Sequence, residues 1–236
     1  MGLTEDDLDA IRAVDGVLDA EGSYATDVLC TIRGNQVAVH VMALQNKMNQ
    51  VQLEDGRLPE KENECVIDAD YLDGKNLKIG DKIILSSGTS DSLEDTLKTD
   101  TFTIVGTVSS PEYIAFHRGS TTIGNGSVSA FLCVPEKAFS LDVYTEITVQ
   151  VEGAKEATAF TKEYEEHVDS VLKKVQAIKA EREQARYDEI TSTAQEKVDE
   201  AQEELAQAEQ DLADGKKEAE EELASAREKP VSYTHL

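Results

Sequence analysis

The sequence predicts an α+β fold in which a small, strand-rich domain is followed by one long helix. Residues 1–153 hold 13 of the 14 glycines and three of the four prolines, whereas residues 154–229 hold one glycine and no proline. Short β-rich runs between turn residues fill the first part, and a seven-residue apolar repeat runs through the second. We therefore expect a mixed α/β and β-barrel or sandwich-like domain over residues 1–153 and a coiled-coil arm over residues 154–229.

The first element predicted is a short amphipathic helix. Thr4 is a suitable N-cap, and acidic residues follow it in the first turn. Leu8, Ile11 and Val14 recur at helical spacing on one face. The segment 14–22 then leads from this helix into a hairpin.

Strands make up most of the rest of the first part. Ala25–Arg33 and Gln36–Leu44 are β-rich runs joined by Gly34-Asn35, which suits a two-residue turn. Such short strands between turns indicate a small barrel or sandwich. Further strands are expected at Gln50–Leu53, Glu64–Asp68, Lys82–Ser86, Thr101–Val108, Ser129–Val134 and Glu146–Glu152.

Two turns stand out between Asp55 and Ser109. Asp55-Gly56 predicts a tight turn, and Leu58-Pro59 stiffens the approach to the next strand. Leu77–Asp81 ends a short helix and re-enters a strand through Gly80, which can adopt a positive φ.

The predicted arm carries two apolar patterns. A first stripe with three- and four-residue spacing is followed by a heptad repeat whose small alanines allow a partner helix to approach closely. The partner is either another chain or a returning helix of the same chain, and we favour the returning helix. The first stripe comprises Phe160, Tyr164, Val168, Val171, Leu172, Val175 and Ile178. The repeat comprises Val198, Leu205, Leu212, Ala219 and Ala226, with Thr191, Ala194, Ala201 and Ala208 at the companion positions.

Charge and composition exclude several partners. The net charge is −25, and no cluster of Lys and Arg exceeds two neighbours. Nucleic acids and anionic lipids need a basic surface, so neither is an expected partner. No segment approaches the roughly 18 apolar residues of a membrane span.

Cys30, Cys65 and Cys133 each lie in an apolar run, so we expect buried thiols, with one disulfide and an odd cysteine as the alternative.

No catalytic or ligand-binding pattern is present. His40, His117 and His167 lie far apart and form no metal-binding spacing. The segment 118–127 is rich in glycine, but it lacks the ending of a phosphate-binding loop and indicates a surface loop with turns. The acidic cluster Glu60–Glu64 matches no calcium-binding loop and indicates a solvated face. We predict no catalytic residue, no cofactor site and no metal site.

The last residues break the helical pattern. Val231–Leu236, VSYTHL, reads as the translation of a sequencing-library adapter, so we expect residues 230–236 to be foreign to the gene. The chain is then expected to be a fragment of a longer protein.

Several motifs together resemble a known family. In order they are Gly56-Arg57-Leu58-Pro59, Asn63–Asp68, Leu77–Asp81 and Phe102–Val108. Their order and spacing resemble the extracytoplasmic core domain of FtsX-like, MacB-type ABC transporter permeases. The downstream segment 110–154 is similar to a bacterial subgroup whose domain carries a long coiled-coil insertion. The helix at residues 3–17 is similar to the segment that follows the first membrane helix.

The resemblance implies a non-catalytic part of a cell-membrane transporter on the extracytoplasmic side. Its implied partners are an ABC ATPase subunit, reached through membrane helices that this chain lacks, a second permease or an internal coiled-coil partner, and an envelope protein. The cargo and the ATPase stay unidentified. The alternatives are a soluble acidic coiled-coil scaffold or adhesion protein, which would form a parallel homodimer, and a hydrolase or nucleotide-binding protein.

Overall fold

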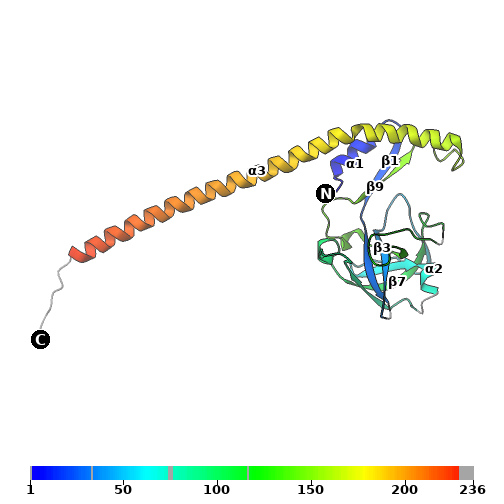
Figure 1. Ribbon diagram of the computed structural model, residues 1–236, viewed down its shortest axis with the longest axis horizontal. Coiled ribbons are helices and arrows are strands. Elements are labelled where there is room, and N and C mark those ends of the chain that lie inside the picture. Colours follow the sequence, from blue (N-terminus) through cyan, green and yellow to red (C-terminus); the bar gives the residue numbers. More distant parts are fainter. Residues whose placement is uncertain (1, 33, 74–76, 116, 229–236) are drawn as a thin grey trace. The chain divides into compact units, whose positions relative to one another are not determined.

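The computed structural model describes residues 2–32, 34–73, 77–115 and 117–228 and has an α+β fold, as predicted (Figure 1). The chain divides into two compact units after Ala177. The first unit contains the strands and the shorter helices, and the second contains most of the long helix α3. The expected adapter segment, 230–236, lies outside the described residues.

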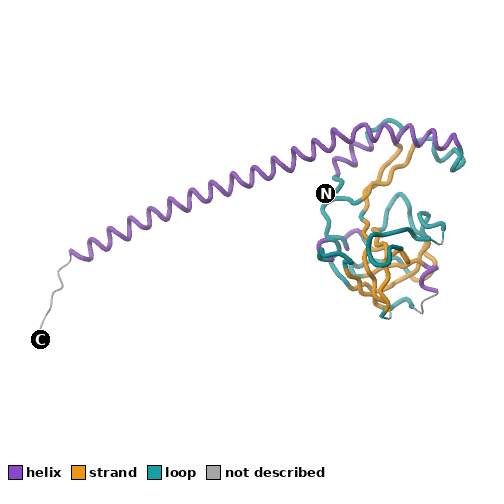
Figure 2. Tube along the Cα trace, in the orientation of Figure 1, coloured by secondary structure: helices purple, strands orange, loops and turns teal. Residues whose placement is uncertain are grey.

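A closed barrel forms the body of the first unit. Within the described residues, seven strands form one sheet in the order β4-β7-β5-β8-β3-β2-β6, and β6 also pairs with β7. Six of these strands thus form a closed barrel, and β4 pairs with the second half of β7, beyond the residues that pair with β6. Figure 2 shows these strands gathered in one body. The strands are β2 (Ala25–Ile32), β3 (Asn35–Ala43), β4 (Gln52–Gly56), β5 (Glu64–Asp68), β6 (Lys82–Ser86), β7 (Thr101–Ser109) and β8 (Val128–Val134).

Two of the strand pairs in this sheet are parallel, β3 with β8 and β5 with β7, and the others are antiparallel. Alternate side chains point inward because successive residues of a strand face opposite sides. Phe102, Ile104 and Leu132 are among the largest fully buried side chains of this interior. A barrel of this size is filled by side chains and holds no channel.

The three cysteines are buried and free, as the first of the two predicted alternatives required. Cys30 and Cys65 belong to the barrel interior. Cys133 belongs to a second apolar cluster with Val66, Val108 and Phe131, covered in part by Tyr113. The described chain therefore contains no disulfide, and its thiols act as small apolar groups.

A separate two-stranded ribbon corrects the sequence prediction. Residues Val17–Ser23 form β1, where only a connection to a hairpin was expected, and β1 pairs antiparallel with β9 (Glu146–Val151). After Val17 the segment contains Leu, Asp, Ala, Glu, Gly and Ser and no further β-branched residue, so local propensity indicates no strand. Pairing with a strand more than a hundred residues away determines its structure.

The first helix and hairpin follow the prediction closely. Helix α1 (Glu5–Arg12) begins after Thr4, whose hydroxyl accepts a hydrogen bond from the Asp7 amide while the Asp7 carboxylate accepts one from the Thr4 amide. In the hairpin, Ile32 faces Asn35, so the turn comes one residue earlier than predicted. Arg33 lies outside the described residues.

Short helices complete the first unit. They are α2 (Ala69–Asp73), η1 (Leu93–Asp95) and η2 (Glu136–Ala138). Gly80 has a φ of 100°, as its predicted turn required.

The long helix α3 (Lys162–Glu228) begins later than the predicted arm. Phe160, expected in its first stripe, has a φ of 64° and is 92% exposed, so it lies outside both the helix and the core. At 1.5 Å per residue, α3 is about 100 Å long. None of the helices in the described part of the chain has an apolar stretch long enough to cross a membrane.

Candidate functional site

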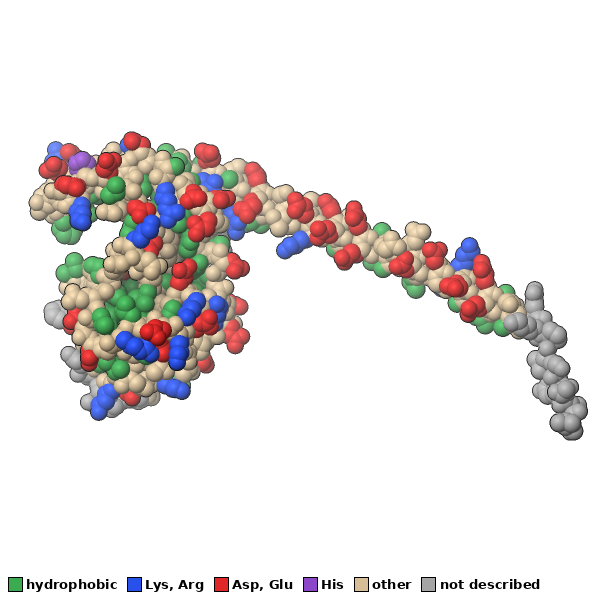
Figure 3. Space-filling view, turned by 180° about the vertical axis from the view of Figure 1, so that it is seen from behind, with side chains coloured by type: hydrophobic (Ala, Val, Ile, Leu, Met, Phe, Trp, Pro, Cys, Tyr) green, Lys and Arg blue, Asp and Glu red, His purple; other side chains and the backbone are tan. Residues whose placement is uncertain are grey.

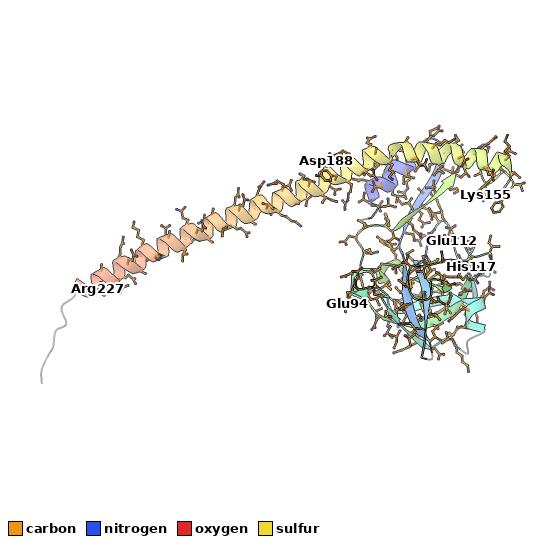
Figure 4. The ribbon with its side chains drawn as sticks, viewed as in Figure 1. Glu94, Glu112, His117, Lys155, Asp188 and Arg227 are labelled. Atoms are coloured by element: carbon orange, nitrogen blue, oxygen red, sulfur yellow. The ribbon has the colours of Figure 1, made fainter. Side chains whose placement is uncertain are left out.

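The three histidines that the structure describes share no site. His40 lies 2.6 Å from Asp27, and the His117 ring accepts a hydrogen bond from the Gly119 amide. His117 is labelled in Figure 4 and is exposed. Among the described residues, no three His, Cys, Asp or Glu side chains are placed to hold a metal ion.

The cysteine thiols are shielded from reaction. Burial raises the pKa of Cys30 to about 12, and burial also raises the pKa values of Cys65 and Cys133. Because the thiolate is the nucleophile, these groups are inert near neutral pH.

The four family-like motifs meet at the middle of β7, at residues Ile104–Gly106, which we call the β7 junction. Cys65 of the second motif is the Cα partner of Ile104. The Arg57 amide of the first motif donates to the Val105 carbonyl at 3.0 Å. The Gly80 amide of the third motif donates to the Ile104 carbonyl at 2.8 Å. Segments that are separated in sequence by up to fifty residues thus bind to three consecutive residues of one strand.

Two glycines allow the first and fourth motifs to approach. Gly56 and Gly106 are Cα partners, and Gly56 has a φ of 78°. A Cβ atom on Gly56 would lie 2.4 Å from the Val105 carbonyl oxygen. A Cβ atom on Gly106 would lie 2.5 Å from the Arg57 carbonyl oxygen. Both contacts are to backbone atoms, which cannot rotate away as a side chain can.

An ion pair joins the first and second motifs. The Arg57 guanidinium donates to both carboxylate oxygens of Glu64 at 2.8 and 2.7 Å, and the amides of Glu60 and Lys61 also donate to Glu64. The hydrogen bonds from Arg57 and from the Glu60 amide lower the pKa of Glu64 to about 2. The predicted solvated face is therefore wrong for Glu64, which is buried and fixes the turn before β5.

The third motif binds to β7 through its turn. The Lys78 amide donates to the Asp81 carboxylate at 3.0 Å, and the Ile104 amide donates to the Asp81 carbonyl at 2.9 Å. The positive φ of Gly80 reverses the chain between these contacts.

A second cluster, not predicted from the sequence, surrounds Arg118. Its guanidinium donates to Asp68 at 2.6 and 3.0 Å and to Asp70 at 2.8 Å. It lies 5.8 Å from the ring centroids of both Tyr113 and Phe131, which stack at 4.7 Å. Arg118 also donates to the Ala115 carbonyl, so one side chain fastens the loop after β7 to the end of β5.

The Arg118 cluster lines a cleft of about 430 Å³. Glu54, Asp55 and Asp70 also line it, so its walls are acidic. Arg118 begins the segment that was expected to form a surface loop. The rest of that segment is such a loop, with positive φ at Gly124 and Gly126 and strand β8 after it, but the Arg118 side chain is only 7% exposed. A single arginine after an apolar segment is too weak a pattern to predict a buried ion pair.

The base of α3 is fastened to the turn between α1 and β1. Val171 is buried, and a Cβ atom on Gly16 would lie 2.7 Å from its Cγ2 atom. The Lys174 ammonium donates to the Asp15 carboxylate at 2.6 Å and to the Asp15 carbonyl at 3.1 Å. The predicted first stripe is thus partly confirmed: Val171 is buried against Gly16 within the first unit, whereas Leu172 is 47% exposed.

Comparison with known proteins finds similar chains among solved structures. No family model and no curated protein matches the chain. Among solved structures, the extracellular domain of the ABC-type transporter YknZ from Gram-positive bacteria is 14% identical, with a TM-score of 0.41, over 66% of this chain and 76% of that one. The periplasmic region of MacB from Actinobacillus actinomycetemcomitans is 14% identical, with a TM-score of 0.39, over 78% of this chain and 84% of that one. The chain is similar to both.

Proposed function

We propose that this chain is a non-catalytic, extracytoplasmic part of a bacterial ABC transporter permease, which couples ATPase-driven motion to transport or to an envelope partner. One observation carries the proposal. The four motifs that resemble the family pack together at the β7 junction, through Gly56, Arg57, Gly80 and Ile104–Gly106. The four motifs, which follow one another along the sequence, therefore form one structural unit and are not isolated resemblances.

The chemistry of the junction suits a part that transmits force. Its contacts are backbone hydrogen bonds, the bidentate ion pair of Arg57 with Glu64, and the close approach of Gly56 to Gly106. All of these contacts resist deformation. Close-packed protein interiors have low compressibility and transmit strain. The one carboxylate among these contacts, Glu64, is held by Arg57 and by the amides of Glu60 and Lys61.

The base of α3 also supports a mechanical role. By the family resemblance, α1 follows the first membrane helix. Motion of that membrane helix would reach α3 through the contact between Gly16 and Val171 and through the ion pair between Asp15 and Lys174. We expect an ABC ATPase subunit on the cytoplasmic side and a second permease or an envelope protein as further partners.

Labelling in intact cells tests the location. Glu94 is exposed on η1 and is labelled in Figure 4, whereas all three native cysteines are buried. A Glu94→Cys variant, expressed from the native gene with its flanking coding sequence, should react with a membrane-impermeant maleimide in intact cells. The unsubstituted protein is the matched control and should stay unlabelled. Labelling only after the cells are opened would contradict an extracytoplasmic location.

Co-purification tests the partner. The same gene product, extracted from membranes with mild detergent, should carry an ATP-hydrolysing subunit whose activity changes when the α3 base is loosened by Lys174→Met. A product that is released without membranes and sediments as a homodimer would instead support the scaffold alternative.

A further inference from the structure

A short joint connects the ribbon of β1 and β9 to the barrel. Tyr24 is the one residue between β1 and β2, and Thr145 comes directly before β9. The Thr145 amide donates to the Ser23 carbonyl at 3.0 Å, and the Thr145 hydroxyl accepts from the Ala25 amide at 2.6 Å. Figure 1 shows β1 and β9 extending from the barrel toward α1. We call Ser23–Ala25 with Thr145 the joint. Hinges are built from a few residues at the ends of elements, as these are.

One face of β1 is fastened to the barrel at a latch. Asp19, Glu21 and Ser23 share this face because side chains alternate along a strand. The Glu21 carboxylate accepts four hydrogen bonds of 2.7 to 3.2 Å from the three amides of Asn46–Met48, and we call these groups the latch. The Lys47 ammonium also donates to Asp19 at 3.1 Å. Successive amides suit an anion, and the carboxylate charge strengthens these bonds.

The latch amides belong to the barrel side of this contact. Their loop follows β3, and the Leu44 amide donates to the Val134 carbonyl of β8 at 2.9 Å. After the latch, the Asn49 side chain donates to Glu112, in the loop after β7, at 2.7 Å. The loop is thus held on the barrel at both ends. Glu21 therefore joins the ribbon to a part of the barrel that is itself fixed.

Two buried oxygens at the same contact have no hydrogen-bond partner in the described part of the chain. They are Ser23 Oγ on the ribbon and Gln45 Oε1 on the loop. Ser23 is only 2% exposed. A buried polar atom without a hydrogen bond costs about as much free energy as a hydrogen bond to a charged group contributes. Turning the ribbon away from the loop would hydrate both oxygens. The latch therefore offsets a cost that arises at the same contact.

We infer that the joint is a hinge and that the latch selects between two orientations of the ribbon on the barrel. In the latched orientation, which the structure shows, Glu21 binds the Asn46–Met48 amides. In the released orientation, water binds these amides and the two buried oxygens. Helix α1 turns with the ribbon, because Arg12 donates to the Ala20 carbonyl at 3.0 Å. The latch thus sets the direction of α1 relative to the barrel, whether or not the chain belongs to a transporter.

Distances between spin labels on the full chain test the hinge. Leu18→Cys on β1 and Ile84→Cys on β6 replace exposed side chains, and the native cysteines are buried, so only the two new thiols take labels. Glu21→Gln removes the charge and one acceptor oxygen, so a second distance should grow on the order of 10- to 100-fold relative to the first. Glu54→Gln, which changes a carboxylate bonded to Ser109, is the matched control and should leave the distances unchanged. A distance distribution that Glu21→Gln leaves unchanged would overturn the inference.

Hydrogen exchange separates a hinge from a loose loop. If the ribbon turns as a body, the joint amides of Ala25 and Thr145 exchange through the same opening as the Asn46–Met48 amides. Glu21→Gln should then accelerate all of them by the same factor. In the unsubstituted chain they should all be less protected than the Ile104 amide in the barrel, because local opening needs less free energy than unfolding. Acceleration confined to Asn46–Met48, or joint amides as protected as Ile104, would refute a hinge.

The variant Ser23→Ala tests the opposing cost. Alanine removes the unpartnered hydroxyl and keeps the site small, so the latched orientation should become more stable. The second distance should become rarer, and the latch amides should exchange about 5-fold more slowly. Faster exchange in Ser23→Ala would show that this hydroxyl stabilises the latched orientation, which contradicts the inference.

Discussion

Replacing Gly56 by alanine tests whether the β7 junction depends on the close approach of two backbones. The change has two costs. Gly56 has a φ of 78°, and an alanine held in the left-handed region costs about 1–2 kcal/mol. The new Cβ atom would also lie 2.4 Å from the Val105 carbonyl oxygen, about 1 Å inside ordinary contact, so the turn must move. That overpacking costs about 1–3 kcal/mol, and weakening the hydrogen bond from Arg57 to Val105 costs about 1 kcal/mol more.

Two other glycines separate these costs. Gly80 has a φ of 100°, and no atom lies within 4 Å of the place that a Cβ atom would take, so Gly80→Ala carries the conformational cost alone, about 1–2 kcal/mol. Gly106 has no positive φ, but its Cβ atom would clash with the Arg57 and Asp55 carbonyl oxygens at 2.5 and 2.7 Å. Gly106→Ala therefore carries the clash alone, about 2–4 kcal/mol. Gly56→Ala should cost about 3–6 kcal/mol, close to the two together.

Urea unfolding measures these differences. The chain has no tryptophan, and α3 dominates the far-ultraviolet signal. Near-ultraviolet circular dichroism of Tyr24, Tyr71 and Tyr113, which are partly buried against the apolar clusters, should therefore report on the barrel. Gly215→Ala, inside α3 with open space around it, is a control that should leave the barrel transition unchanged. If Gly80→Ala destabilises the barrel as much as Gly56→Ala, the close approach is not what holds the junction together.

Three further outcomes are expected. Arg118→Met should destabilise the first unit by about 3–5 kcal/mol in urea unfolding, because it leaves Asp68 buried and unpaired, and adding Asp68→Leu should recover much of the loss. The pKa of Glu64 is lowered to about 2, so its contribution to stability is present above its unfolded pKa near 4.5 and is lost as pH falls toward 2. Glu64→Gln should therefore make the free energy of unfolding less dependent on pH over that range. A pH profile unchanged by this substitution would contradict the pairing with Arg57. The thiols should resist Ellman's reagent at mildly alkaline pH in the native chain and react when guanidinium chloride unfolds it, whereas fast labelling of native Cys30 would contradict its raised pKa.

Local patterns predicted much of the barrel. Strands β5 and β6 have the predicted bounds, Glu64–Asp68 and Lys82–Ser86. Each is a short β-rich run next to a turn whose residues determine the backbone, such as Gly80. Such elements are readable from sequence because their cause lies within a few residues of them.

Elements whose cause is distant were not predictable. β1 becomes a strand because β9 pairs with it, and the buried pair of Arg118 and Asp68 joins residues fifty positions apart. Phe160 fits the apolar spacing of α3 but lies before the helix begins. Periodicity describes which side chains could share a face, whereas only the fold decides where a helix starts and which face it buries.

The two units differ in how much of their apolar surface they bury within themselves. In the first unit, each strand from β2 to β8 pairs within the same sheet, and all three cysteines are buried. The part of α3 after Ala177 buries almost none of its apolar repeat, and acidic side chains lie along it (Figure 3). Like charges four residues apart, such as Glu196 and Glu200, weaken an isolated helix. The barrel strands pair with one another and bury their apolar side chains, whereas this part of α3 would gain packing from a second helix.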